Sequence, residues 1–189
     1  MRNKISSIDQ QITEKLQSFS NLRVGKILFG ILSHSGDSWY WCAGLFVIWI
    51  FSEGEAQRVT AFWGLAIAGT AVLVFLIKKG FKRERPAGEW GGIYRKQDPH
   101  SFPSGHAVRA GLIICLAWQT FGTPWLFVFI LWGVVMTLSR VVMGVHYFSD
   151  IVAGILLGLA IGTLVVVLQP LTYQVFPWLF DRSQWFRGG

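Results

Sequence analysis

Two long stretches without a charged residue constrain this chain more than any other feature. Residues 59–77 and 151–168 run for 19 and 18 positions without Asp, Glu, Lys or Arg. A helix needs about 20 apolar residues to cross the hydrocarbon core of a bilayer. Charged residues make up 14% of the whole chain, against about 25% in a typical soluble domain. The sequence therefore predicts an all-α integral membrane protein.

The other apolar segments extend this prediction to a bundle of six membrane helices in one domain over residues 1–189. The helices are predicted at 21–34, 38–52, 59–77, 104–121, 125–142 and 147–168. The EGEAQR segment before the third helix is expected to be a turn, and Pro170 is expected to end the sixth. Glycines recur every four residues in the sixth helix, at Gly154, Gly158 and Gly162, which favours close packing of a neighbouring helix.

The first 20 residues lack the continuous apolar core of a cleavable signal peptide. Apolar residues instead recur every three or four positions, with charged residues between them: Ile5, Ile8, Ile12, Leu16 and Phe19. This spacing predicts an amphipathic helix at the membrane surface. A helix packed against the rest of the protein is the alternative.

Basic residues are concentrated after the third predicted helix. Residues 78–96 contain seven Lys or Arg against two Glu, in a chain of net charge +7. A solvated loop that faces anionic lipid headgroups would explain this charge, as would an anion-binding site. Lys78, Arg85 and Pro86 form a K-x6-R-P pattern here, which is weak evidence by itself because basic residues commonly flank membrane helices.

A second polar cluster, residues 103–106, opens the fourth predicted helix with Pro-Ser-Gly-His. The start of a helix offers unpaired backbone N–H groups that bind phosphate well. Ser104 is able to cap the helix or donate its hydroxyl to an anion, and Gly105 lets the backbone approach closely. An ordinary serine cap followed by a structural His106 explains the tetrapeptide equally well when it is taken alone.

A third cluster, residues 139–150, places Arg140, His146 and Asp150 around the start of the sixth helix. His146 and Asp150 are four residues apart and so lie on one helix face. A carboxylate at this spacing can hold one imidazole nitrogen and leave the other free as a base or nucleophile. Ionisable residues at a membrane boundary are expensive and are functional candidates by default.

The order of helix crossings puts all three clusters on the same side of the membrane. Together they offer three cations and helix N–H groups for a tetrahedral dianion, and two histidines as nucleophile and general acid. Two histidines and an aspartate are also possible metal ligands, but the neighbouring cations would repel a divalent ion. Metal-independent phosphoryl transfer without a cofactor fits these residues better. Cys42 and Cys115 lie in apolar segments and are expected to act as small hydrophobic residues.

The three patterns K-x6-R-P, P-S-G-H and S-R-x5-H-x3-D, in this order, resemble the three-part signature of the type 2 phosphatidic acid phosphatase (PAP2) superfamily. The resemblance implies that His146 attacks phosphorus, that Asp150 orients it, and that His106 protonates the leaving group. It also implies that the phosphoryl oxygens are bound by Lys78, Arg85, Ser104, Gly105 and Arg140. The sequence leaves three possible partners for Arg109: the site, a lipid headgroup and Asp98. His100 is expected to have a role in the loop.

The predicted function is hydrolysis of a membrane lipid phosphate or diphosphate through a phosphohistidine. Phosphatidylglycerol phosphate, phosphatidate, undecaprenyl diphosphate and lipid A phosphate are all admissible substrates. A lipid phosphotransferase is the alternative enzyme, and a non-enzymatic anion-binding membrane protein or transporter is the alternative class. No nucleic acid and no obligate protein partner are expected.

Two features of the sequence give opposite predictions for the membrane orientation. A count of Lys and Arg puts the basic loop in the cytoplasm, but these residues are also needed for phosphate binding. The family resemblance implies a bacterial inner-membrane protein with its site on the periplasmic face. With six crossings, both ends of the chain would then lie in the cytoplasm.

Overall fold

The computed structural model describes residues 2–21, 23–87 and 98–180 of the chain. These residues form helices joined by short links, and they contain no strand beyond one antiparallel bridge that pairs Glu84 with His100. The predicted all-α fold class is confirmed. Part of the predicted loop between the third and fourth helices, residues 88–97, lies outside the described residues.

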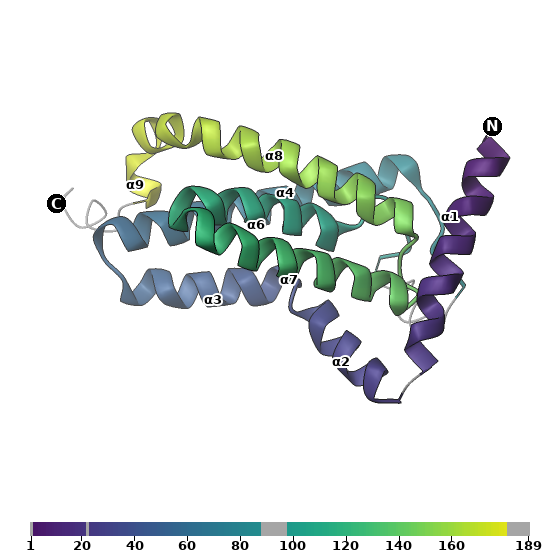
Figure 1. Cartoon of the computed structure of the whole chain (residues 1–189). Helices are drawn as coiled ribbons and strands as arrows, with labels where there is room; N and C mark the ends of the chain where they lie inside the picture. The colour runs from purple at the N-terminus through teal and green to yellow at the C-terminus, as the bar shows by residue number, and fades with distance from the viewer. Residues whose placement is uncertain (1, 22, 88–97, 181–189) are drawn as a thin grey trace.

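Five helices lie side by side as the body of the molecule (Figure 1): α3 (Ser38–Phe51), α4 (Gly54–Phe81), α6 (Gly105–Phe121), α7 (Thr123–Val142) and α8 (Phe148–Val175). By length and composition, α4, α7 and α8 can each cross a membrane, and α3 is a shorter apolar helix. Helix α6 is central, because Leu112, Ile113 and Leu116 have no exposed surface. Large apolar side chains are exposed on the outer helices, as expected for a surface that faces lipid.

Two predicted boundaries are wrong. The EGEAQR segment is not a turn, because α4 already begins at Gly54. Pro170 does not end the last long helix, because α8 continues through it to Val175. Proline removes one backbone hydrogen bond, which a helix in a membrane protein can tolerate when neighbouring groups compensate. Helix α4 also continues beyond its predicted end at residue 77, so Lys78 lies in its last turn and not in a loop.

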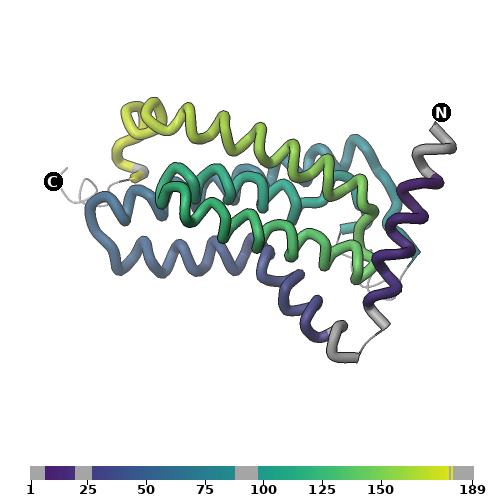
Figure 2. The backbone as a smooth tube through the Cα atoms, viewed as in Figure 1, coloured from purple at the N-terminus to yellow at the C-terminus, as the bar shows by residue number. Residues whose placement is uncertain are grey.

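The short helices occupy the two ends of the bundle (Figure 2): α1 (Arg2–Gln17), the 3-10 turn η1 (Ser18–Asn21) and α2 (Arg23–His34) at one end, and α9 (Pro177–Phe180) at the other. Helix α2 has 12 residues, about 18 Å at 1.5 Å per residue, which is short for a crossing of its own. It leads into α3 through a bend, and both helices run away from α1. The count of six crossings, with both ends of the chain on one side, therefore stays a prediction.

Helix α1 crosses the end of the bundle where α4 ends and α8 begins (Figure 1). It buries Asp9 and Thr13 against the bundle and exposes Ile8 and Ile12. Leu16 packs against the cluster of Ala107, Val141 and Ile151. Two polar side chains of this helix therefore face the protein, and two of its apolar side chains face outward.

The glycine pattern of α8 brings that helix against α6. A Cβ atom at Gly154 would lie 2.7 Å from the Ala107 Cβ, and one at Gly162 would lie 2.8 Å from the Cys115 Cβ. A Cβ at Gly158 would overlap the backbone of Val108. The predicted packing role of these glycines is confirmed. As a result the start of α6 lies beside the start of α8, and the Ser104 N–H donates to the Asp150 carbonyl at 3.1 Å.

Candidate active site

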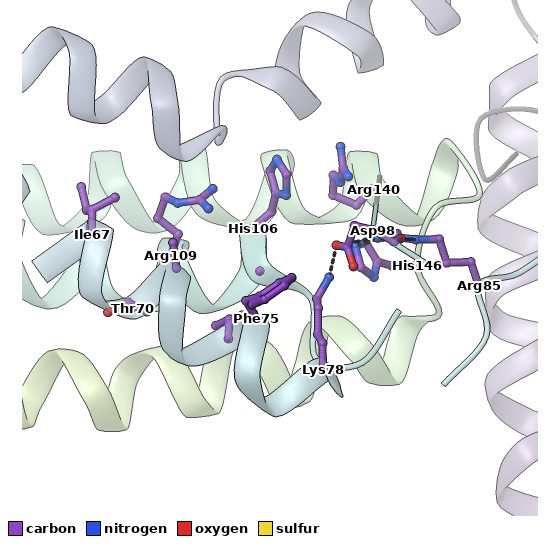
Figure 3. Close-up of a pocket in the computed structure, with 13 residues that line it drawn as sticks. Ile67, Thr70, Phe75, Lys78, Arg85, Asp98, His106, Arg109, Arg140 and His146 are labelled. Atoms are coloured by element: carbon purple, nitrogen blue, oxygen red, sulfur yellow. Dashed lines mark hydrogen bonds and ion pairs between the residues drawn. The ribbon is translucent and has the colours of Figure 1, made fainter. Parts of the chain in front are cut away.

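A cavity of about 280 Å³ lies among α4, α6 and α7, near the end of the bundle that α1 covers. Side chains from all three predicted clusters line it, as Figure 3 shows: Lys78, Arg85, His106, Arg140 and His146, together with Gly105 and Arg109. Ser104 and Asp150 are fully buried next to these residues. The structure therefore brings the sequence-predicted residues together in one place.

The first cluster reaches the cavity because the chain reverses just after α4. Lys82 ends the helix in the left-handed conformation, with φ 50°, and its N–H donates to the Lys78 carbonyl. The following residues then pair with the segment before α6, since the Ser101 N–H donates to the Arg83 carbonyl at 2.8 Å. This pairing directs Arg85 back into the bundle, where it is buried.

Lys78 and Arg85 share one carboxylate that the sequence analysis did not assign. The Lys78 Nζ donates to Asp98 and to the His100 carbonyl. The Arg85 guanidinium donates to the Asp98 Oδ2 at 2.9 Å and to the Val145 carbonyl at 2.7 Å. Asp98 thus binds the two cations that the sequence had suggested for phosphate, and His100 contributes a backbone carbonyl.

His146 lies in the link between α7 and α8 and is almost completely buried. Its Nε2 lies 3.3 Å from an Arg85 nitrogen, and its Nδ1 lies 3.5 Å from the Asp150 Oδ2. Because the guanidinium can only donate, Nε2 is the acceptor and carries the free lone pair. Burial lowers the pKa of His146 well below its usual value, and the charges of Arg85, Arg140 and Lys78 lower it further. His146 is therefore a neutral imidazole at neutral pH.

Asp150 is held in place from two directions. Its Oδ1 accepts a hydrogen bond from Arg83 at 2.7 Å, and its Oδ2 accepts one from the Tyr147 N–H at 2.9 Å. The second bond is half of a capping box at the start of α8. The expected proximity of Asp150 to His146 is present, and Arg83 is an additional partner that sequence reasoning missed.

Ser104 precedes α6 but does not cap it, because its hydroxyl makes no capping hydrogen bond. Among the described residues no group hydrogen-bonds this buried hydroxyl. A Cβ atom at Gly105 would lie at an ordinary distance, 3.5 Å, from Val74, so packing of the protein does not itself require glycine here. Gly105 lines the cavity, and Ser104 lies directly before it in the chain.

The segment between α2 and α3 closes the other side of the site. Arg140 donates to the Ser33 hydroxyl at 2.6 Å, and the His106 Nε2 lies 2.7 Å from an Asp37 carboxylate oxygen. Arg109 donates to the Gly36 carbonyl. The question left open for Arg109 thus has an answer: it lines the cavity and binds this segment, whereas Asp98 binds Lys78 and Arg85.

Four charged residues at the site were given no role there by the sequence analysis: Asp9, Asp37, Arg83 and Asp98. Asp9 lies in α1, and the other three lie in links between helices, where charged residues are normally solvated. Asp37 directly precedes α3, so a helix cap is its ordinary interpretation. Among the described residues no three His, Cys, Asp or Glu side chains are arranged to hold a metal ion.

The arrangement is suited to chemistry on a tetrahedral anion. Four cationic side chains and the first turn of α6 line one cavity that also contains two histidines: Lys78, Arg85, Arg109 and Arg140, with His106 and His146. Fixed positive groups in a site with little water stabilise developing negative charge strongly.

Comparison with known proteins places these residues in a family. The profile of the PAP2 superfamily matches residues 59–173. A decaprenylphosphoryl-5-phosphoribose phosphatase from Mycobacterium tuberculosis is 32% identical over 140 residues, which cover 71% of this chain and 75% of that protein. A lipid A 1-diphosphate synthase from Escherichia coli is 26% identical over 148 residues, 71% of this chain and 62% of that protein.

Two solved structures have the same fold. A PAP2-type phosphatidylglycerolphosphate phosphatase from Bacillus subtilis has a TM-score of 0.73 and is 22% identical, with 89% of this chain and 87% of that chain covered. LpxE from Aquifex aeolicus has a TM-score of 0.65 at 22% identity, with 83% and 93% covered.

Proposed function

Because this chain belongs to the PAP2 superfamily and is a phosphatase, we propose that it hydrolyses a membrane lipid phosphate or diphosphate through a phosphohistidine. The proposal assigns His146 as the nucleophile and His106 as the general acid. The neutral state of His146 supports this assignment, because a protonated imidazole has no lone pair with which to attack phosphorus.

In the first step, the His146 Nε2 forms a bond to phosphorus while the bond from phosphorus to the leaving oxygen breaks. His106 donates a proton to that oxygen. In the second step a water molecule gives a proton to His106 and its oxygen bonds to phosphorus, while the bond to His146 breaks. Inorganic phosphate is released and both histidines return to their starting states. A positioned acid of this kind contributes about 10²–10⁴-fold.

The cation set would bind the phosphoryl oxygens in both steps. Lys78, Arg85 and Arg140 supply charge, and the Ser104 hydroxyl and the Gly105 N–H supply neutral donors. Asp98 binds two of these cations, so a substrate dianion would compete with its carboxylate. Because the site is cationic, we propose that the reaction needs no metal ion.

A lipid substrate is supported above all by the wall of the cavity. Ile67, Thr70 and Val74 are buried on one face of α4 and line the cavity together with Lys78. From Ile67 to Lys78 this face runs about 16 Å at 1.5 Å per residue. A headgroup phosphate at Lys78 would therefore have a mostly apolar surface beside it, along which a lipid chain could lie.

The membrane arrangement is part of the proposal. We expect α4, α6, α7 and α8 each to cross the bilayer, and α2 and α3 together to form one further crossing. The amphipathic helix α1 would then lie at the membrane surface on the side of the site, with its exposed Ile8 and Ile12 toward lipid. We place the protein in a bacterial inner membrane with the site on the periplasmic face, as a single domain over residues 1–189.

A lipid phosphotransferase is the second candidate, in which an alcohol or phosphate acceptor replaces water in the second step. The similarity of this chain to a lipid A 1-diphosphate synthase favours this candidate.

The test uses purified protein in detergent, a panel of short-chain lipid phosphates and diphosphates, and a chelator. We expect release of inorganic phosphate in the presence of chelator, and a loss of at least about 10³-fold in His146→Ala. His100→Ala is the matched control, since that side chain lies outside the proposed chemistry, and it should stay within a few-fold of wild type.

Full activity in His146→Ala would refute the nucleophile, and loss of wild-type activity with chelator would refute a metal-free reaction. Phosphate recovered on a lipid acceptor, without release, would favour the phosphotransferase.

A further inference from the structure

The bend between α2 and α3 carries a carboxylate that binds two histidines. One oxygen of Asp37 lies 2.7 Å from the His106 Nε2, and the other lies 2.9 Å from the His34 Nδ1. Asp37 occupies the N-cap position of α3, where an aspartate normally accepts a backbone N–H, yet its side chain makes no such bond. Both oxygens are instead directed to imidazole rings.

The backbone around Asp37 is held firmly against His106. A Cβ atom at Gly36 would lie 2.6 Å from the Met136 Sδ and 2.9 Å from a His106 ring carbon, so this turn packs directly on the ring. Arg109, one turn beyond His106 on α6, donates to the Gly36 carbonyl. The Asp37 N–H also donates to the His34 carbonyl at 2.9 Å. The carboxylate is therefore fixed in position relative to His106.

The charges around His106 make this carboxylate important. Arg109 on the same helix and Arg140 on α7 line the same cavity as His106. Lys78 and Arg85 also line this cavity, as do His146 and Asp98. Asp37 is the carboxylate within hydrogen-bond distance of His106 among the described residues. Neighbouring cations disfavour a positive charge on an imidazole, and a contacting anion favours it.

The Asp37 side chain is mostly buried beside both rings, with 18% of its surface exposed. A carboxylate in hydrogen-bond contact with an imidazole stabilises a positive charge on that ring.

We propose that Asp37 is a positioning residue for the general acid: it binds the Nε2 of His106, leaves Nδ1 for the leaving oxygen, and stabilises the positive charge that the ring carries before the leaving oxygen accepts the proton. This inference rests on the proposed function, in which His106 is the acid. Arg109 acts one step further away, because it fixes the Gly36 carbonyl and with it the turn that carries Asp37.

The test compares two leaving groups in the same purified protein. An alkyl phosphate such as a short-chain phosphatidate needs a proton on its leaving oxygen, whereas p-nitrophenyl phosphate leaves as a stable phenolate without one. For Asp37→Asn we expect a loss of about 10²-fold on the alkyl substrate at pH 7.5, and less than about threefold on the aryl substrate. Lowering the pH to 5.5 should restore part of the alkyl activity, because bulk acid then protonates His106.

Three further variants complete the test. Asp37→Glu keeps a carboxylate and should retain more alkyl activity than Asp37→Asn, and Glu53→Gln, at the far end of α3, is the matched control that should behave as wild type. Equal losses on both substrates with no recovery at low pH would overturn the proposal and leave Asp37 a structural residue, as would equal losses in the Glu and Asn variants. His106→Ala separates the two proposals: if it shows no difference between leaving groups, the acid role of His106 fails, and the proposed mechanism fails with it.

Discussion

Asp9 on the N-terminal helix and Asp150 beside His146 bind the same guanidinium. Arg83 donates to the Asp9 Oδ2 and to the Asp150 Oδ1, each at 2.7 Å. Asp9 also accepts hydrogen bonds from the Ser149 N–H at 2.9 Å and from the Ser149 hydroxyl at 2.6 Å. Helix α1 is therefore connected through Asp9 and Arg83 to Asp150, the carboxylate next to the candidate nucleophile His146.

This connection predicts that Asp9 affects catalysis without touching the cavity. Replacing Asp9 with Ala removes one of the partners of Arg83 and the acceptor of the Ser149 N–H, a loss of about 1–3 kcal/mol in buried hydrogen bonds. We expect kcat to fall about tenfold, equivalent to about 1.4 kcal/mol, with KM unchanged because the cation set is intact. Glu14→Gln, on the exposed side of the same helix, should have neither effect. An unchanged kcat in Asp9→Ala would show that α1 does not support the site.

A second prediction concerns the contact between α6 and α8. Gly158→Ala would place a methyl group into the backbone of Val108, and relief of that overlap requires the helices to separate. Overpacking of this kind typically destabilises a protein by about 1–3 kcal/mol, which thermal unfolding in detergent would detect. Gly64→Ala on α4 is the matched control, since nothing lies within 4 Å of a Cβ there. Equal melting temperatures for the two variants would contradict the close approach.

The lowered pKa of His146 predicts a pH dependence of stability. Below the unfolded pKa of about 6.5, the unfolded chain binds a proton on this ring that the folded chain does not bind. Stability is therefore complete above that pH and decreases as the pH falls, by about 1 kcal/mol between pH 7.5 and 5.5. His146→Asn should lose less stability than wild type over this interval when both are unfolded thermally in detergent. The same decrease in both proteins would show that His146 does not contribute it.

The membrane arrangement predicts that the two ends of the chain face opposite sides. Five crossings put α1 on the side of the site and α9 on the other side, whereas six crossings put both ends together. Reporter fusions ahead of Met1 and after Gly189 distinguish these cases, and a periplasmic site predicts a cytoplasmic signal at Gly189 alone. Cytoplasmic signals from both fusions would contradict five crossings and support six.

The fold class and the three motif clusters followed from local properties of the sequence. Charge-free stretches of 18 and 19 residues identify membrane helices because of their length and polarity alone. The spacing of Lys78 to Arg85, and of His146 to Asp150, similarly involves residues close together in the chain. Helix ends were less predictable: Pro170 ends a helix only if nothing compensates for its missing N–H, and that depends on neighbouring helices.

The partners of these motif residues were decided by the tertiary structure. Asp37 is 69 positions from His106, Asp9 is 74 from Arg83, and Asp9 is 140 from Ser149. At such separations no local pattern links two residues, because their meeting depends on how α6 packs on α8 and on where α2 bends into α3. The sequence by itself thus determined an all-helical membrane protein with three sets of residues that are predicted to bind phosphate. Only the packing of its helices decided which charges surround each histidine, because those charges come from helices and links far apart in the chain.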